Sequence, residues 1–123
     1  MKRPNLASMS VAQLVERFSA ICIEQYKYLR HDEIERYNQS FDDLVAIKDE
    51  LKARPGDQRN ALLPLLGHQN PQVRLKAALY SLAVAPVAAR RALEVLREDN
   101  EFPQAAYAHQ TLTALDEGAS RLS

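Results

Sequence analysis

Residues 62–82 read LLPLLGHQNPQVRLKAALYSL, and we expect the fold to be organised around this stretch. It predicts two short apolar helices joined by a tight polar turn. The second helix, over residues 71–84, is apolar on most of its circumference. A helix of this kind lies in the middle of a packed structure, with neighbours on several sides. The sequence therefore predicts that this helix is the centre of the molecule and that the other segments cover it.

Two residues fix where the central helix begins. Asn70 is a favoured N-cap, and Pro71 follows at the first helical position, where its missing N–H breaks no helical hydrogen bond. The preceding helix, over residues 58–67, contains Pro64, which would remove a backbone hydrogen bond from a helix interior. That helix is therefore predicted either to start near Ala61 or to be kinked.

Apolar residues recur every three or four positions along most of the chain, which is the helical period. No run alternates apolar and polar residues as a strand would, so the fold class is all-α. The predicted helices span residues 10–30, 32–53, 58–67, 71–84, 86–98 and 103–117. Connectors of two to five residues make successive helices antiparallel. Residues 1–9 are expected to be a frayed lead-in and residues 119–123 to be disordered.

The length of the chain fits a single domain over residues 1–123. An N-terminal capping hairpin would span residues 10–54, a central hairpin residues 57–84, and a C-terminal hairpin residues 86–118. One hairpin cannot bury its own apolar face, so about three stacked hairpins are the minimum for stability. We therefore expect an α–α superhelix of three stacked antiparallel hairpins.

A repeat within the second half of the chain supports this arrangement. Leu63 and Leu66 are followed by a polar turn, and Leu93 and Leu96 repeat that pattern thirty residues later. Each leucine-rich helix is followed by one rich in alanine, whose small side chains let helices approach closely. Two similar helical hairpins in succession are typical of an α-solenoid.

Residues 61–82 carry a more specific pattern: a leucine-rich helix with Pro64, then Asn70-Pro71-Gln72-Val73-Arg74, then Ala77-Ala78. This pattern resembles the HEAT/armadillo helical repeat, whose first helix carries a proline and whose second opens with Val-Arg. In that family the arginine of one repeat often engages an aspartate in the turn of its neighbour. The whole chain also resembles a small bacterial HEAT-like family of unknown function.

Charge and cysteine content bear on the class of protein. Sixteen basic and sixteen acidic residues leave no net charge, and the signs also balance within residues 1–60 and within residues 61–123. A nucleic-acid binder usually carries excess basic charge, so we expect no nucleic-acid partner. Cys22 has no second cysteine to pair with, which is typical of the cytoplasm. No run approaches the ~20 apolar residues that span a membrane, and we expect no membrane partner.

No catalytic or metal-binding pattern stands out in the sequence. His31, His68 and His109 are too far apart along the chain for a zinc motif. The three glycines are isolated from one another, so no glycine-rich phosphate loop exists. We therefore expect a protein that is not an enzyme and that holds no metal or cofactor.

The helices over residues 71–84 and 103–117 would line the concave surface of a solenoid. Their polar and aromatic residues form the candidate protein-binding face: Arg74, Lys76, Tyr80, Tyr107 and His109. Tyrosine and arginine are frequent at protein-interaction hot spots. Arg74 has two interpretations. The favoured one is a structural residue that bridges the turns of adjacent hairpins, and the other is a contact with a ligand.

The expected function is non-catalytic protein–protein interaction with an unidentified protein in the cytoplasm. Self-association into a homodimer is a second expectation, because a short solenoid exposes its end hairpins. Two alternatives stay open at this point. One is a bacterial immunity-type protein that neutralises a toxin. The other is an enzyme or a nucleic-acid-processing HEAT-like domain, which the charge balance disfavours.

Overall fold

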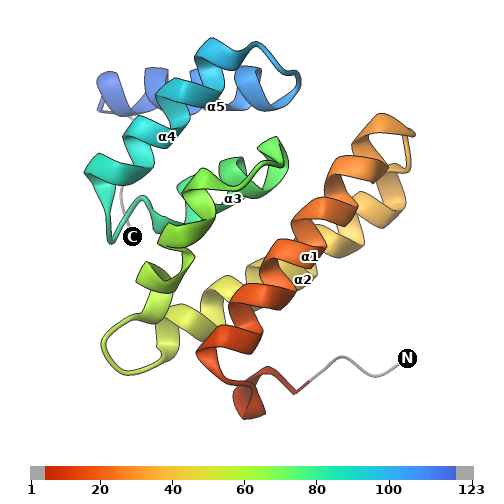
Figure 1. The fold of residues 1–123 in the computed structure, drawn as a ribbon, viewed down its shortest axis with the longest axis vertical. Coiled ribbons are helices and arrows are strands. Elements are labelled where there is room, and N and C mark those ends of the chain that lie inside the picture. Colours follow the sequence, from red (N-terminus) through yellow and green to blue (C-terminus); the bar gives the residue numbers. More distant parts are fainter. Residues whose placement is uncertain (1–4, 119–123) are drawn as a thin grey trace. The chain divides into compact units, whose positions relative to one another are not determined.

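A computed structural model describes residues 5–118 of the chain, and every regular element in that range is a helix (Figure 1). In chain order the elements are the 3₁₀-helix η1 (Leu6–Ser8), α1 (Val11–Arg30), α2 (Ile34–Ala53), the 3₁₀-helix η2 (Gln58–Gly67), α3 (Pro71–Ser81), α4 (Pro86–Asp99) and α5 (Gln104–Asp116). The all-α prediction is confirmed, and all six expected helices are present over this range. The expectations for residues 1–4 and 119–123 lie outside the described residues.

The chain forms two compact units, Met1–Ala61 and Leu62–Ser123. The first unit contains η1, α1 and α2, the second contains α3, α4 and α5, and η2 crosses the boundary. The first expected hairpin ends at residue 54 and the second begins at residue 57. That boundary lies a few residues before the division between the two units, which falls between Ala61 and Leu62. The prediction of a single domain stays a prediction.

In the first unit, α1 and α2 form the antiparallel hairpin that was expected over residues 10–54. A capping box starts α1: the N–H of Gln13 donates to Ser10 Oγ (3.1 Å), and the N–H of Ser10 donates to Gln13 Oε1 (2.8 Å). These bonds satisfy two donors at the start of the helix. Both helices contribute fully buried side chains: Leu14, Phe18, Cys22, Leu44, Ile47 and Leu51.

Arg54 joins the end of α2 to the start of the chain. Its Nη2 donates to the backbone oxygens of Leu6 (3.0 Å) and Met9 (2.6 Å), and its Nε donates to Glu50 Oε2 (2.9 Å). These bonds hold η1 beside α2. The frayed lead-in expected over residues 1–9 is therefore wrong for residues 5–9. The sequence pattern could not reveal this, because the cation that satisfies these carbonyls lies far along the chain.

The segment that contains Pro64 is a 3₁₀-helix over its full length, Gln58–Gly67. An α-helix would set the proline ring against the carbonyl four residues before it and would lose a hydrogen bond. Asp57 precedes the segment with a left-handed backbone (φ 51°). Its carboxylate accepts from the backbone N–H (3.3 Å), Nε (2.9 Å) and Nη2 (2.6 Å) of Arg59. Both predicted alternatives, an α-helix starting near Ala61 and a kinked one, are therefore wrong.

In the second unit, α3 lies at the centre of the packing, as the sequence predicts. Eight of its eleven residues are buried. α3 and its C-cap share one hydrophobic cluster, here called the core cluster, with α4 and α5. Its buried members are Leu75, Ala78, Leu82, Ala89, Leu93, Leu96, Ala108 and Leu112. Residues from all three helices therefore form a single apolar interior within this unit.

α3 and α5 lie side by side, as a solenoid arrangement of the second and third hairpins requires. Between them Gln104 Nε2 donates to Gln72 Oε1 (2.9 Å), and both amides are buried. Asn70 caps α3 as predicted, with its Oδ1 accepting from the N–H of Gln72 (2.8 Å). α3 ends at Ser81 rather than at residue 84. Beyond that end, the N–H groups of Val84 (3.1 Å) and Ala85 (2.8 Å) donate to the carbonyl of Ser81 in a turn that leads into α4.

Leu93 is fully buried in the core cluster. Replacing a buried leucine by alanine costs about 2–5 kcal/mol, through lost apolar contact and the cavity left behind. We expect Leu93→Ala to lower the free energy of unfolding by about that amount in urea titrations of the full chain. Val87→Ala, on the exposed side of the same helix, should change it by less than about 0.5 kcal/mol. Equal losses would contradict the orientation of α4.

The carboxyl group of Asp57 has a lowered pKa, mainly because it accepts hydrogen bonds from the side chain of Arg59. Its charge therefore stabilises the fold above the unfolded-state pKa, and this stabilisation is lost as pH falls through the folded-state pKa. Asp57→Asn removes the charge but keeps a side chain that tolerates a left-handed backbone. We expect its thermal midpoint to lie below that of the wild type at neutral pH. The difference should vanish at about pH 2, and its persistence there would contradict the assignment.

Candidate docking face on helix α4

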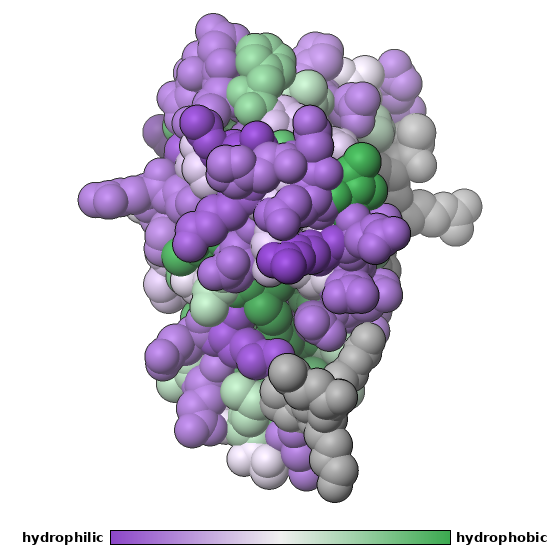
Figure 2. All heavy atoms as spheres, turned by 90° about the vertical axis from the view of Figure 1, so that its right-hand side faces the viewer, coloured by the Kyte–Doolittle hydropathy of each residue, from purple (hydrophilic) through white to green (hydrophobic). Residues whose placement is uncertain are grey.

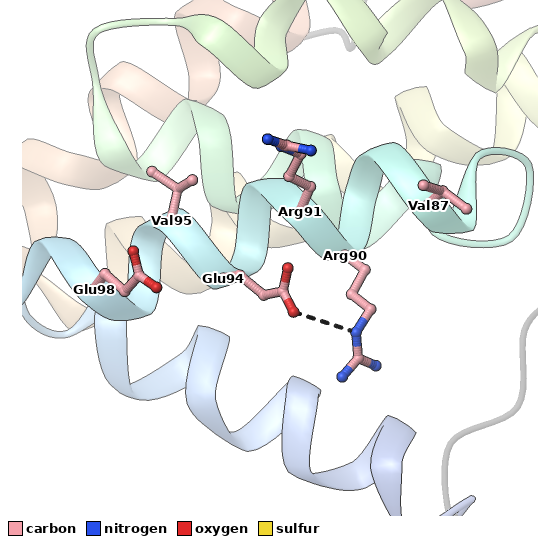
Figure 3. Close-up of a pocket in the computed structure, with 6 residues that line it drawn as sticks. All are labelled: Val87, Arg90, Arg91, Glu94, Val95 and Glu98. Carbon is pink, nitrogen blue, oxygen red and sulfur yellow. Dashed lines mark ion pairs between the residues drawn. The ribbon is translucent and has the colours of Figure 1, made fainter.

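α4 turns one side into the core cluster and the other side outward. Its buried residues are Ala89, Leu93 and Leu96. Two rows of side chains run along the outward side, and a spacing of four residues keeps each row on one line of the helix. The valine row is Val87, Arg91 and Val95, and the charged row is Arg90, Glu94 and Glu98. Together they form what is here called the α4 face (Figure 3).

A groove of about 340 Å³ runs beside the valine row. Its lining comes from the end of η2, the first turn of α3 and one side of α4: Leu66, Gly67, Arg74, Ala88, Arg91, Ala92 and Val95. Leu66 and Ala92 also pack against the core cluster, so the floor of the groove is apolar and continuous with the interior. A Cβ at Gly67 would meet nothing within 4 Å, which leaves that end of the groove open.

The two rows themselves border a shallow hollow of about 410 Å³. Within the charged row, Arg90 Nε lies 3.5 Å from Glu94 Oε2, the pair drawn in Figure 3. Arg90 Nη2 also donates to Asp116 Oδ1 of α5 (2.5 Å). The hydrogen bond to Asp116 is the main cause that raises the pKa of the Arg90 guanidinium above its usual value. Arg90 therefore serves to join α4 to α5.

The two arginines that line the groove differ in their surroundings. Arg74 Nη1 donates to Asp99 Oδ2 (3.1 Å), and only 18% of the Arg74 side chain is exposed. Arg91 is exposed and makes no ion pair or hydrogen bond within residues 5–118. Its neighbours in the row are the exposed Val87 (82%) and Val95 (45%). The valine row thus places a solvated cation between two exposed apolar side chains.

The structure brings one of the five predicted binding residues, Arg74, to this groove. Lys76 is buried and Tyr80 is half-buried, both on α3. Tyr107 and His109 are exposed on α5. Residues two positions apart on an α-helix point in nearly opposite directions, so Arg74 is separated from Lys76, and Tyr107 from His109. The binding role of the other four residues stays a prediction.

The ion pair between Arg74 and Asp99 agrees with the structural interpretation of that arginine. Asp99 is the last residue of α4, next to the connector that leads into α5. The pair therefore links the start of α3 to the turn of the following hairpin. Its acidic member comes from the next turn of the chain, whereas the turn before Arg74 has no aspartate.

Sequence reasoning did not select three exposed residues of the α4 face, Val87, Arg91 and Val95. The signal that could have added the valines is their spacing, four residues before and four after Arg91, on the side opposite Leu93. An apolar residue on the outer side of an amphipathic helix is the feature to look for.

The structure also bears on metal sites and membrane spans. No group of three or more His, Cys, Asp or Glu side chains within residues 5–118 is placed to hold a metal ion. Over that same part of the chain, every helix is too short or too polar to cross a membrane.

Figure 2 shows one face of the molecule, on which hydrophilic residues predominate and hydrophobic residues appear as small separate patches.

Comparison with known proteins gives a family and a solved structure. The profile of a family described as a domain of unknown function, DUF2019, matches residues 12–116. The crystal structure of the protein RPA1889 from Rhodopseudomonas palustris CGA009 is similar, with 44% sequence identity and a TM-score of 0.95, over 98% of this chain and 100% of that chain. Among curated proteins, none matches the chain. The expected likeness to a family of unknown function is confirmed, and its likeness to HEAT repeats stays a prediction.

The different surroundings of the two arginines predict different effects on stability. Arg74→Ala should lower the free energy of unfolding by about 1 kcal/mol, because it removes an ion pair and the packing of a largely buried side chain. Arg91→Ala should change it by less than about 0.5 kcal/mol, because Arg91 has no partner within residues 5–118. Urea unfolding of both variants checks this. Similar losses in the two would mean that Arg91 supports the fold.

Proposed function

The chain belongs to the DUF2019 family, and we propose that it is a non-catalytic protein-interaction domain that docks its partner on the α4 face and the groove beside it. The observation that carries this proposal is the exposure of Val87 and Val95 on either side of Arg91. These three side chains lie outside the core cluster. An exposed apolar patch rimmed by polar groups is typical of a protein-binding surface.

The composition of the groove supports docking rather than chemistry. Leu66, Ala88 and Ala92 supply alkyl surface, and two arginines border it. No lining residue of the groove is a nucleophile or a general base. Arginine is one of the residues enriched at protein interfaces, where its guanidinium can donate to carboxylates and backbone oxygens.

The charge of the α4 face favours a protein over a nucleic acid. Arg90 and Arg91 are matched there by Glu94 and Glu98, so the face has no net positive charge. Nucleic-acid binding draws most of its affinity from phosphate contacts with unopposed cations. A protein partner can place a carboxylate and an apolar side chain where each is needed. Cys22 is buried and is the one cysteine of the chain, which supports a cytoplasmic setting for this interaction.

We also propose that residues 57–118 are built from two HEAT-like hairpins. η2 with its Pro64 and α3 would form the first hairpin, and α4 with α5 the second. The ion pair from Arg74 to Asp99 supports this, because it joins the second helix of one hairpin to the turn of the next. That is the contact which the resemblance to HEAT repeats implies.

Site-specific photo-crosslinking tests the proposed docking surface. A benzophenone amino acid replaces Val95 in the full chain, expressed in the cells that naturally make it. The matched control carries the same amino acid at Thr113, which is exposed on α5. We expect a discrete adduct from position 95 and none from position 113. The protein identified in the adduct, once purified, should bind the wild type at least about tenfold tighter than it binds Val95→Asp.

Two results would contradict the proposal. One is a position 95 that gives no more adduct than position 113. The other is a purified partner whose affinity is unchanged by Val95→Asp, since a charge placed in an apolar contact costs well over 1 kcal/mol when it is buried. Circular dichroism of Val95→Asp shows whether the variant is folded.

A further inference from the structure

We infer that the α4 face binds an amphipathic helix from a different protein, with a carboxylate of that helix placed against Arg91. This inference rests on the proposed function and names the chemistry of the partner. It follows from the charge of Arg91, the geometry of the two rows and the symmetry that a second copy of this chain would impose.

Arg91 needs an anion from outside the chain once the face is covered. A partner that covers Val87 and Val95 also removes water from Arg91 between them. Removing a cation from water without an anionic partner is strongly unfavourable. Among the carboxylates of α4, Glu94 pairs with Arg90 (3.5 Å) and Asp99 pairs with Arg74 (3.1 Å). Glu98 lies about two turns from Arg91 along the helix and makes no ion pair with it. The partner therefore has to supply the carboxylate.

The geometry of the α4 face fits a helix. The side chains of each row are four residues apart and form a ridge, and the shallow hollow lies between the two ridges. A second helix packs here when one of its own ridges of side chains enters this hollow. Val87 and Val95 are eight residues apart, which is about 12 Å along the axis. Two to three turns of a partner helix cover that distance, with apolar residues near each valine and an acidic residue between them.

A second copy of this chain does not satisfy these requirements. In a two-fold symmetric dimer the same surface meets itself, so each contact occurs twice with the residues exchanged. Pairing α4 with α4 so that Val87 meets Val95 places Arg91 of one protomer against Arg91 of the other. Like charges brought together on burial are unfavourable. The valines and the arginine can be satisfied together only by a surface with a carboxylate at the central position, which α4 lacks.

A library of helical peptides displayed on phage tests the inference. The library randomises one face of a three-turn host helix, and selection uses the full chain as the immobilised target. We expect binders with apolar residues about two turns apart and with Asp or Glu between them. Selection on Arg91→Glu should instead enrich Lys or Arg at that central position. Arg97→Glu is the matched control, because Arg97 is exposed on the same helix but lines neither hollow.

A synthetic peptide of the acidic consensus then gives the magnitude. Its dissociation constant should rise about tenfold for Arg91→Glu and less than about twofold for Arg97→Glu. Peptides that lose binding with Val95→Asp but show no acidic preference would overturn the inference and leave the proposed docking face standing. Peptides whose binding ignores Val95→Asp, or no enrichment at all, would count against both. A wild-type dimer in sedimentation that Val95→Asp dissociates would assign the face to a second copy and overturn the inference.

Discussion

The packing of α3 against α4 and α5 is the constraint on which the second unit depends. Leu75 and Leu82 meet Leu93 and Leu112 in one apolar cluster. Full burial of each leucine contributes about 1.5–3 kcal/mol, whereas a partly exposed ion pair such as the one made by Arg74 contributes about 0–1 kcal/mol. The core cluster therefore determines where the helices of this unit lie, and the polar contacts affect only the helix ends.

The α4 face is a consequence of the packing in the core cluster. Once Leu93 and its buried neighbours on α4 face inward, the helical period turns the valine row and the charged row outward. The ends of η2 and α3 then supply the far wall of the groove. α3 is buried over most of its surface and is poorly suited to bind anything itself. The most buried helix of the unit thus holds the structure, and its more amphipathic neighbour α4 offers the surface.

The sequence was sufficient for the helices because local rules determine them. A capping box at Ser10, an N-cap at Asn70 and prolines near helix starts mark the boundaries, and the period of apolar residues gives the buried sides. Prediction failed where a distant group decides the local structure. The carbonyls near the N-terminus are satisfied by Arg54, which no local pattern announces. Around Pro64 the chain forms a 3₁₀-helix, which the patterns that identify α-helices do not predict.

The candidate site was harder to predict than the fold, for a physical reason. Residue type indicates that arginine and tyrosine are common at interfaces, but exposure decides which of them can be reached. Lys76, one of the predicted binding residues, is buried, whereas Val87, which no sequence pattern singled out, is exposed. The lack of a partner for Arg91 within residues 5–118 is likewise a property of the folded chain. Which side chains are exposed and which have partners can be determined only after the packing of α3, α4 and α5 is known.

The central claim is that the helix holding the second unit together and the surface available for binding are separate. A saturation-substitution scan over residues 62–118, with resistance to proteolysis as the readout of folding stability, tests this most directly. We expect polar substitutions to be strongly destabilising at the buried apolar positions of α3 and at Leu93, and to be tolerated at Val87, Arg91 and Val95. Destabilisation at those three positions as severe as at Leu93 would contradict it, because the α4 face would then belong to the folding core.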